Sequence, residues 1–317
     1  MIRPLFRWLS PPGPRARLSI LIFHRVLSQP DPLFPGEIDA TRFSEICGWL
    51  ASWFNVLPLD QAVQRLRDGS LPGRPLSITF DDGYADNYRV ALPILLQHGL
   101  TATFFISTGF LDGGRMWNDT VIEAIRATAL PELDLRGIGG IDLEGAPIDS
   151  IDARRAAIER IIAATKYLDA ASRQAVVDTI AERAEADLPD DLMMTSAEVI
   201  GLRSAGMHLG AHTASHPILA RLDRAAARSE IEEGKRVLEA LTTAPVELFA
   251  YPNGKPGEDY SDETVALVRE AGFSAAVSTA SGVADRHSDP FQLPRFTPWD
   301  RSRLKFGVRL GLNLWTG

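Results

Sequence analysis

The sequence predicts an α/β fold in which a parallel sheet or barrel is covered by helices. Short apolar runs rich in β-branched and aromatic residues alternate with amphipathic helical patterns along most of the chain. Glycine stands where several of these helices would end before the next strand, as in QHGL and REAGF. With 317 residues, of which 45% are hydrophobic, the chain is long enough to form one large core or two small ones.

The elements follow one another in a regular β then α order. Each predicted strand is a short apolar run, and each predicted helix has apolar residues on one face. In folds of this kind, reactive groups gather at the carboxyl ends of the strands. The predicted strands are 18–24, 76–80, 101–107, 207–212, 246–252 and 273–278, and the predicted helices are 43–54, 59–68, 87–98, 196–205, 224–241 and 262–271.

A single large domain is expected over residues 18–298, between an N-terminal segment (1–17) and a C-terminal tail (299–317). Residues 112–191 or thereabouts interrupt the alternation and read as a mostly helical insertion, with a hairpin in LDLRGIGGIDLEG. The insertion either shapes a substrate groove or only shields a sheet edge, and the sequence leaves both open.

Composition excludes several classes of protein. The formal net charge is −8 and no dense run of lysine or arginine is present, so nucleic acid is not an expected partner. The single cysteine allows neither an intrachain disulfide nor a multi-thiolate metal site. The apolar run at 18–23 is too short for a signal peptide, so a cytoplasmic location is expected.

Both ends of the chain mix basic and bulky apolar residues, in IRPLFRWL and RLKFGVRLGLNLW. Segments with this composition lie at membrane surfaces, and they also pack as ordinary terminal helices. Peripheral contact with the cytoplasmic face of a membrane and simple packing on the domain are both open.

Two adjacent carboxylates, Asp81 and Asp82, end the predicted strand in SITFDDGYADN. Neighbouring like charges are costly unless a cation neutralises them. His212 and His216, in GAHTASHP, also follow a predicted strand. One carboxylate and two imidazoles form the open three-ligand site typical of catalytic zinc, although either motif alone is common in turns and on surfaces.

Together, TFDDG and HTASH resemble the motifs of the NodB-type polysaccharide deacetylases, carbohydrate esterase family 4. The resemblance implies a distorted, incomplete (β/α) barrel that removes acetyl groups from sugars with a divalent metal, zinc first and cobalt or nickel as alternatives. It implies Asp81 as the general base and Asp82, His212 and His216 as metal ligands. FAYPNG fits the third motif of the family, which assigns the oxyanion-binding backbone N–H to Tyr251.

Two departures from the family pattern concern the proton donor and the partner of the base. Ala250 stands where the family has an arginine that orients the base, and Arg295, in QLPRF, stands where the family has its general-acid histidine. His24 ends the first predicted strand, as in a subgroup that acts on β-1,6-linked poly-N-acetylglucosamine. We hypothesise that His24 is the general acid and that Arg295 takes the place of the missing arginine beside Asp81. The alternative for His24 is a structural histidine held by hydrogen bonds.

The substrate is less determined than the fold. The leading interpretation is removal of N-acetyl groups from an amino-sugar polysaccharide or glycan precursor, including a lipid-linked one. A deformylase or other deacylase of a lipid-linked aminosugar is the second, and a catalytically inactive glycan-binding module is the third. Asn253, Trp117 and Trp299 are candidates to line a sugar site, or else belong to the packed interior.

Overall fold

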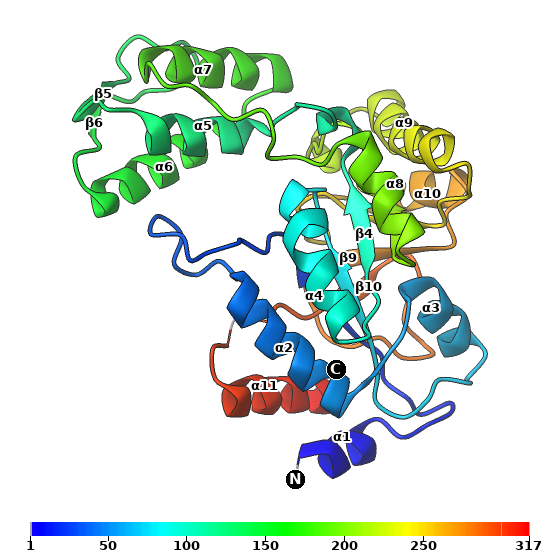
Figure 1. Cartoon of the computed structure of the whole chain (residues 1–317). Helices are drawn as coiled ribbons and strands as arrows, with labels where there is room; N and C mark the ends of the chain where they lie inside the picture. The colour runs from blue at the N-terminus through cyan, green and yellow to red at the C-terminus, as the bar shows by residue number, and fades with distance from the viewer. Residues whose placement is uncertain (1, 299, 317) are drawn as a thin grey trace. The chain divides into compact units, whose positions relative to one another are not determined.

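The computed structural model describes residues 2–298 and 300–316, which divide into two compact units (Figure 1). The first unit contains the chain up to Gln29, then Ile38–Asp112, and the chain from Met194 onward. The second unit contains Pro30–Glu37 and Gly113–Met193.

The first unit is built on an eight-stranded sheet whose paired strands, among the described residues, run parallel to one another. Its order is β1-β3-β4-β7-β8-β9-β10, and β2 pairs with the start of β3. Phe296, just after β10, exchanges backbone hydrogen bonds with Ile20 and Ile22 of β1 at 2.8 and 3.1 Å, which nearly closes the sheet into a barrel. The strands are β1 (Ser19–Phe23), β2 (Asn55–Val56), β3 (Pro75–Phe80), β4 (Thr103–Ile106), β7 (His208–Ala211), β8 (Leu248–Ala250), β9 (Ala275–Ser281) and β10 (Leu293–Arg295).

Helices connect the strands and confirm the predicted (β/α) order. They are α1 (Ile2–Leu9), α2 (Ala40–Trp53), α3 (Leu59–Arg67), the π-helix η1 (Asn87–Ala91), α4 (Leu92–Gln97), the short η2 (Thr108–Phe110) and η3 (Leu219–Arg221), α8 (Ser196–Ser204), α9 (Arg224–Thr242), α10 (Asp262–Glu270) and α11 (Arg303–Thr316). Within residues 2–298 and 300–316, none of the helices has the combination of length and apolar character that crossing a membrane requires.

The core of the first unit fills the space between sheet and helices. Phe80 of β3 stacks on Phe104 of β4 with ring centroids 4.7 Å apart, and Phe23 of β1 stacks on Phe80 at 5.3 Å. Full burial of such a side chain contributes about 1.5–3 kcal/mol. This packing fixes the strands whose ends carry the site.

The second unit has a core of its own. Its helices are α5 (Trp117–Ala127), α6 (Ile151–Thr165) and α7 (Ala170–Arg183), and the expected hairpin is present as β5 (Glu132–Asp134) paired with β6 (Gly145–Pro147). The core includes Val121, Ile158, Ile161 and Val177, all buried. Arg126 ties Pro30–Glu37 to this unit through an ion pair with Asp31 at 2.7 Å.

Candidate active site

The conformation after β3 separates the two adjacent aspartates. Asp82 has φ +79° and Gly83 has φ +95°, so the chain turns sharply as soon as the strand ends. A Cβ on Gly83 would lie 3.1 Å from the Ile106 side chain, so the turn needs glycine there. A non-glycine residue in the left-handed region costs about 1–3 kcal/mol and is typical of functional sites. The close packing of the turn against Ile106 holds the backbone of Asp82 in this conformation.

Asp82, His212 and His216 meet in one cluster. Their ligand atoms all lie within 4.8 Å of one another. The Nε2 atoms of His212 and His216 each lie 3.4 Å from Asp82 Oδ1, and the two rings are 4.9 Å apart. His216 reaches the cluster with φ +54°, and its N–H donates to Thr213 Oγ1 at 3.1 Å.

The surroundings of the cluster suit a divalent cation. His212 Nδ1 donates to the Ala250 carbonyl at 2.7 Å, which orients the ring so that Nε2 faces Asp82. Burial raises the pKa of Asp82, but a hydrogen bond with His212 and the positive charge that the surrounding imidazoles carry when protonated outweigh it and lower that pKa well below its usual range. Burial lowers the pKa of His216 to about 4, so its imidazole is neutral at neutral pH. An ionised carboxylate beside imidazole nitrogens is the donor set that zinc prefers.

Asp81 points to a different partner. Arg295 donates Nη1 to Oδ1 and Nη2 to Oδ2 of Asp81, both at 2.7 Å, and both side chains are almost fully buried. Arg295 is held in turn by the Ser278 carbonyl at 2.8 Å and Thr79 Oγ1 at 3.2 Å. Burial raises the pKa of Asp81, yet the Arg295 charge outweighs it and lowers the pKa below its usual value. The structure therefore forms the contact that the sequence hypothesis required, and Asp81 is ionised.

His24 follows β1 at the same end of the sheet and is exposed to solvent. Burial raises the pKa of Asp82, and the charge that His24 carries when protonated is one of the effects that lower it, after the hydrogen bond with His212 and the charge of His216. The His24 carbonyl accepts a hydrogen bond from Asn87 Nδ2 at 2.8 Å. The exposed position does not fit the structural alternative, a core histidine held by hydrogen bonds.

Comparison with known proteins decides the family. The family described as polysaccharide deacetylase matches residues 68–128 and 158–276, which is more than half of the chain. The chain belongs to the polysaccharide deacetylase family, of the NodB type and carbohydrate esterase family 4. It is 20% identical over 290 residues to YxkH of Bacillus subtilis (strain 168), whose name also assigns it to this family, and the match covers 91% of this chain and 73% of YxkH.

Solved deacetylases share the fold. IcaB from Ammonifex degensii has a TM-score of 0.61 and 17% identity, with 96% of this chain and 98% of that chain covered. The Streptococcus pyogenes deacetylase PplD, solved in complex with acetate, has a TM-score of 0.59 and 17% identity, with 89% and 92% covered. These similarities establish the distorted (β/α) barrel.

The role predicted for Tyr251 needs correction. Its backbone N–H donates to the Val277 carbonyl of β9 at 3.2 Å, and its hydroxyl donates to the Phe291 carbonyl at 2.9 Å. Both donors are therefore used inside the fold. Pro252 has no N–H. The next N–H in the motif belongs to Asn253, which has φ +58° and whose N–H makes no hydrogen bond within the described residues.

Sequence reasoning missed the residues that hold the histidine loop. Glu230 of α9 accepts hydrogen bonds from the N–H groups of Ala214 and Ser215 at 3.1 and 2.8 Å. Gly234, one turn further along α9, lets the loop approach the helix closely: a Cβ at this position would lie 2.7 Å from the Thr213 carbonyl carbon. The only sequence signal was a glycine inside a helical pattern, which is usually unfavourable and therefore indicates close packing.

The residues that the sequence offered to line a sugar site belong to different parts of the chain. Trp117 lies in α5 of the second unit, where the Arg173 guanidinium lies 5.0 Å from its ring centroid. Trp299 lies outside the described residues. Asn253 follows β8, at the strand end beside Ala250.

Proposed function

We propose that the chain is a metal-dependent hydrolase that removes N-acetyl groups from an amino-sugar polysaccharide or glycan precursor. The observation that carries the proposal is that two consecutive residues carry carboxylates with different surroundings. Asp82 shares a cluster with two imidazoles, and Asp81 is buried and ionised beside it. Amide hydrolysis needs both, because water must be activated and its proton must be removed.

The residues fit a bound metal, which Asp82, His212 and His216 would hold. Zinc suits this donor set best, and cobalt or nickel are alternatives. When bound, such an ion lowers the pKa of water and polarises the acetyl carbonyl.

The other side chains would then move protons and hold geometry. Asp81 would take the proton of the attacking water as the water oxygen bonds to the acetyl carbon, and Arg295 would keep both carboxylate oxygens in place. The N–H of Asn253 is the available donor for the oxyanion. His24 would give a proton to the sugar nitrogen as the C–N bond breaks, which releases acetate and an amine.

The inactive-binder alternative fits these contacts less well. A binding module would gain nothing from burying Asp81 against Arg295, since a buried ion pair is weak support for stability.

The test is metal-dependent release of acetate and formate from purified protein. Substrates would include N-acetylglucosamine oligomers, acetylated bacterial glycans, and lipid-linked N-acetyl and N-formyl aminosugars. Acetate release that requires added zinc or cobalt supports the proposal. Formate release in excess of acetate would replace it with the deformylase, and binding without release of either acid would leave the binding module.

A further inference from the structure

The first and last helices of the chain pack together at one side of the first unit (Figure 1). Phe6 of α1 is buried, and its ring would lie 3.7 Å from a Cβ at Gly311 of α11. The Arg17 guanidinium donates to the Leu314 carbonyl, and also to the Trp315 carbonyl at 3.3 Å, so it joins the end of α11 to the segment after α1. The two terminal helices therefore form one packed pair.

The outer face of this pair is apolar and open. On α11 the buried stripe of Phe306, Leu310 and Leu314 faces inward. An exposed apolar stripe occupies the opposite face, at helical spacing. Six of the ten exposed large hydrophobic residues in the described chain lie on these two helices: Leu5, Trp8, Leu304, Val308, Leu312 and Trp315. We call this set the terminal patch.

Two tryptophans form one end of the terminal patch, near the last residues of α1 and α11. Trp8 and Trp315 are stacked with ring centroids 5.6 Å apart, yet they remain 65% and 61% exposed. An indole that finds no place in the protein core is costly to leave in water. Tryptophan is enriched where an apolar phase meets water, because its ring is apolar and its N–H is polar.

The terminal segments also differ from the rest of the chain in charge. Residues 1–17 and 300–317 contain eight arginine or lysine residues and one aspartate, whereas the rest of the chain contains 25 basic and 40 acidic residues. Arg3 and Arg7 of α1 and Arg303 and Lys305 of α11 are exposed on the same two helices. The exposed apolar face thus lies within the one strongly basic part of an acidic protein.

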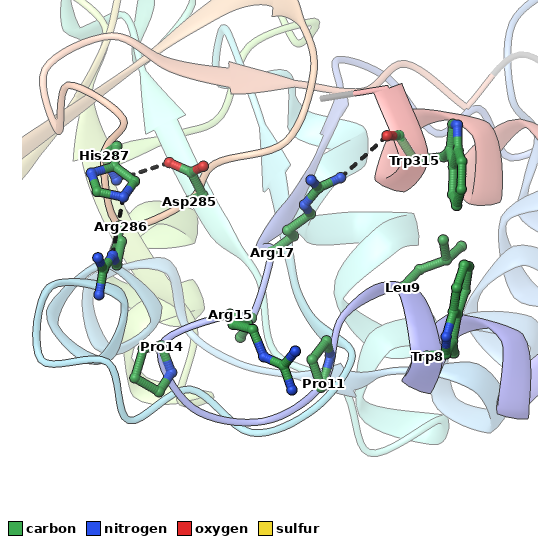
Figure 2. A pocket seen from close by; sticks show the side chains of 11 residues that line it. Trp8, Leu9, Pro11, Pro14, Arg15, Arg17, Asp285, Arg286, His287 and Trp315 are labelled. Atoms are coloured by element: carbon green, nitrogen blue, oxygen red, sulfur yellow. Dashed lines mark hydrogen bonds between the residues drawn. The ribbon is translucent and has the colours of Figure 1, made fainter.

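A pocket of about 670 Å³ opens beside the stacked tryptophans (Figure 2). Trp8 and Trp315 line one side, and Arg15, Arg17 and Arg286 supply guanidinium groups around it. One carboxylate, that of Asp285, also lines the pocket, but it accepts hydrogen bonds from the neighbouring backbone N–H groups of 287 and 288 at 2.8 and 3.1 Å. Guanidinium groups beside an aromatic wall suit a lipid phosphate next to an acyl chain.

We propose that the terminal patch binds the surface of an anionic lipid bilayer. Apolar side chains and tryptophans would enter the headgroup region, and the surrounding arginines would pair with lipid phosphates, as in interfacial helices. Charge favours this occupant over a second copy of the chain, because two patches of the same positive sign would repel each other across a symmetric interface.

The terminal patch and the candidate active site lie at opposite ends of β3, so lipid binding can be tested separately from catalysis. Ser10, just after α1, accepts a hydrogen bond from the N–H of Arg74 at 2.9 Å, and Arg74 immediately precedes β3. Asp81 and Asp82 follow the other end of β3. Trp8 therefore lies toward the amino ends of the strands, and its substitution should leave turnover of a soluble substrate unchanged.

The test is sedimentation of the full-length protein with lipid vesicles. One set of vesicles is phosphatidylcholine alone, and the other is phosphatidylcholine mixed with phosphatidylglycerol. We expect binding to the anionic vesicles, weakened by added salt as screening increases. The double variant Trp8→Ala, Trp315→Ala should bind at least about tenfold more weakly, because it loses most of the aromatic area that enters the interface. The control is Tyr167→Ala, an aromatic residue that is 67% exposed in the second unit.

A charge variant completes the test. Arg3→Glu, Arg7→Glu should abolish the preference for phosphatidylglycerol, whereas Arg236→Glu on α9 should not. Circular dichroism would verify that all variants fold. No binding to either vesicle, equal binding to both, or unchanged binding by the tryptophan variant would overturn the proposal. So would a concentration-dependent dimer that the tryptophan variant abolishes, since the patch would then serve a second copy.

Discussion

Asp81 and Asp82 are consecutive residues, yet the two sides of the site give them opposite surroundings. Asp81 continues the direction of β3 and is bound at both oxygens by the buried Arg295. Asp82 turns away with φ +79° and lies 3.4 Å from two imidazole nitrogens. On one side, the carboxylate of Asp81 is held by the guanidinium of Arg295, a cation that belongs to the protein. Under the proposed function, the other side supplies a carboxylate for a bound metal ion, so that a single strand end would provide both a base and a metal ligand.

The largest effect is expected on the metal side. His212→Ala removes a nitrogen from the cluster, and turnover should fall by about 10³-fold or more, since a bound metal supplies several kcal/mol of transition-state stabilisation. Bound zinc, measured by mass spectrometry of the purified protein, should be lost with it. The control is His208→Ala at the start of the same strand, where His208 pairs with Asp60 at 3.2 Å. Zinc retained at one ion per chain in His212→Ala would show that the cluster is not the metal site.

His24→Ala tests proton donation to the leaving group. Turnover of an N-acetyl sugar should fall by about 10²–10⁴, the usual range for general acid catalysis. An aryl acetate ester should be much less affected, because its phenolate leaves without a proton. His287→Ala, an exposed histidine elsewhere in the chain, is the control. Equal losses on amide and ester would assign His24 to substrate binding instead.

Arg295→Lys tests whether the arginine positions the base. Lysine keeps the charge but cannot donate to both oxygens of Asp81, so activity should fall by about 10–10²-fold, as for other outer-shell partners. Burial raises the pKa of Asp81 and the arginine lowers it, so weaker pairing should raise that pKa. The acidic limb of kcat/KM should therefore move to higher pH. A lower rate with an unmoved limb would indicate a structural role alone.

The smallest effect concerns the loop that carries the histidines. In Gly234→Ala, the new Cβ would lie 2.7 Å from the Thr213 carbonyl carbon, so the loop must shift. We expect a loss of about 1–3 kcal/mol in the free energy of unfolding, typical of overpacking, together with weaker zinc binding. Gly48→Ala on α2 is the matched control, because its Cβ would make only ordinary contact at 3.5 Å with His98. Denaturant titration and zinc titration would measure the two effects.

The parts of the site that sequence could predict lie where a motif meets a strand end. Asp82, His212 and His216 were expected together because each follows a buried apolar run, and parallel strands bring their carboxyl ends to one edge. The two short strands β2 and β10 were not predicted, since neither has a periodic pattern long enough to recognise. Arg295 was nevertheless predicted to pair with Asp81, because Ala250 stands where the family has the arginine that orients the base and another cation had to replace it.

The parts that sequence could not predict depend on backbone hydrogen bonds and close approaches. The motif alone does not reveal that the N–H of Tyr251 is already paired with Val277. Nor does it show that Asn87, the first residue of the π-helix η1, holds the carbonyl of His24. Both contacts join segments far apart in the chain, and they depend on strand register and helix geometry.

The most direct test of the two-sided site is a zinc titration of wild type and Asp81→Asn, each freed of metal by a chelator, with acetate release followed in the same samples. We expect both proteins to bind one zinc ion with similar affinity, and we expect the variant to release acetate about 10²–10⁴ times more slowly than the wild type. The double variant Asp81→Asn, Arg295→Met, which leaves no unpaired buried charge, should be as inactive as Asp81→Asn. Wild-type acetate release by Asp81→Asn, or loss of its zinc, would contradict the separation of base and ligand.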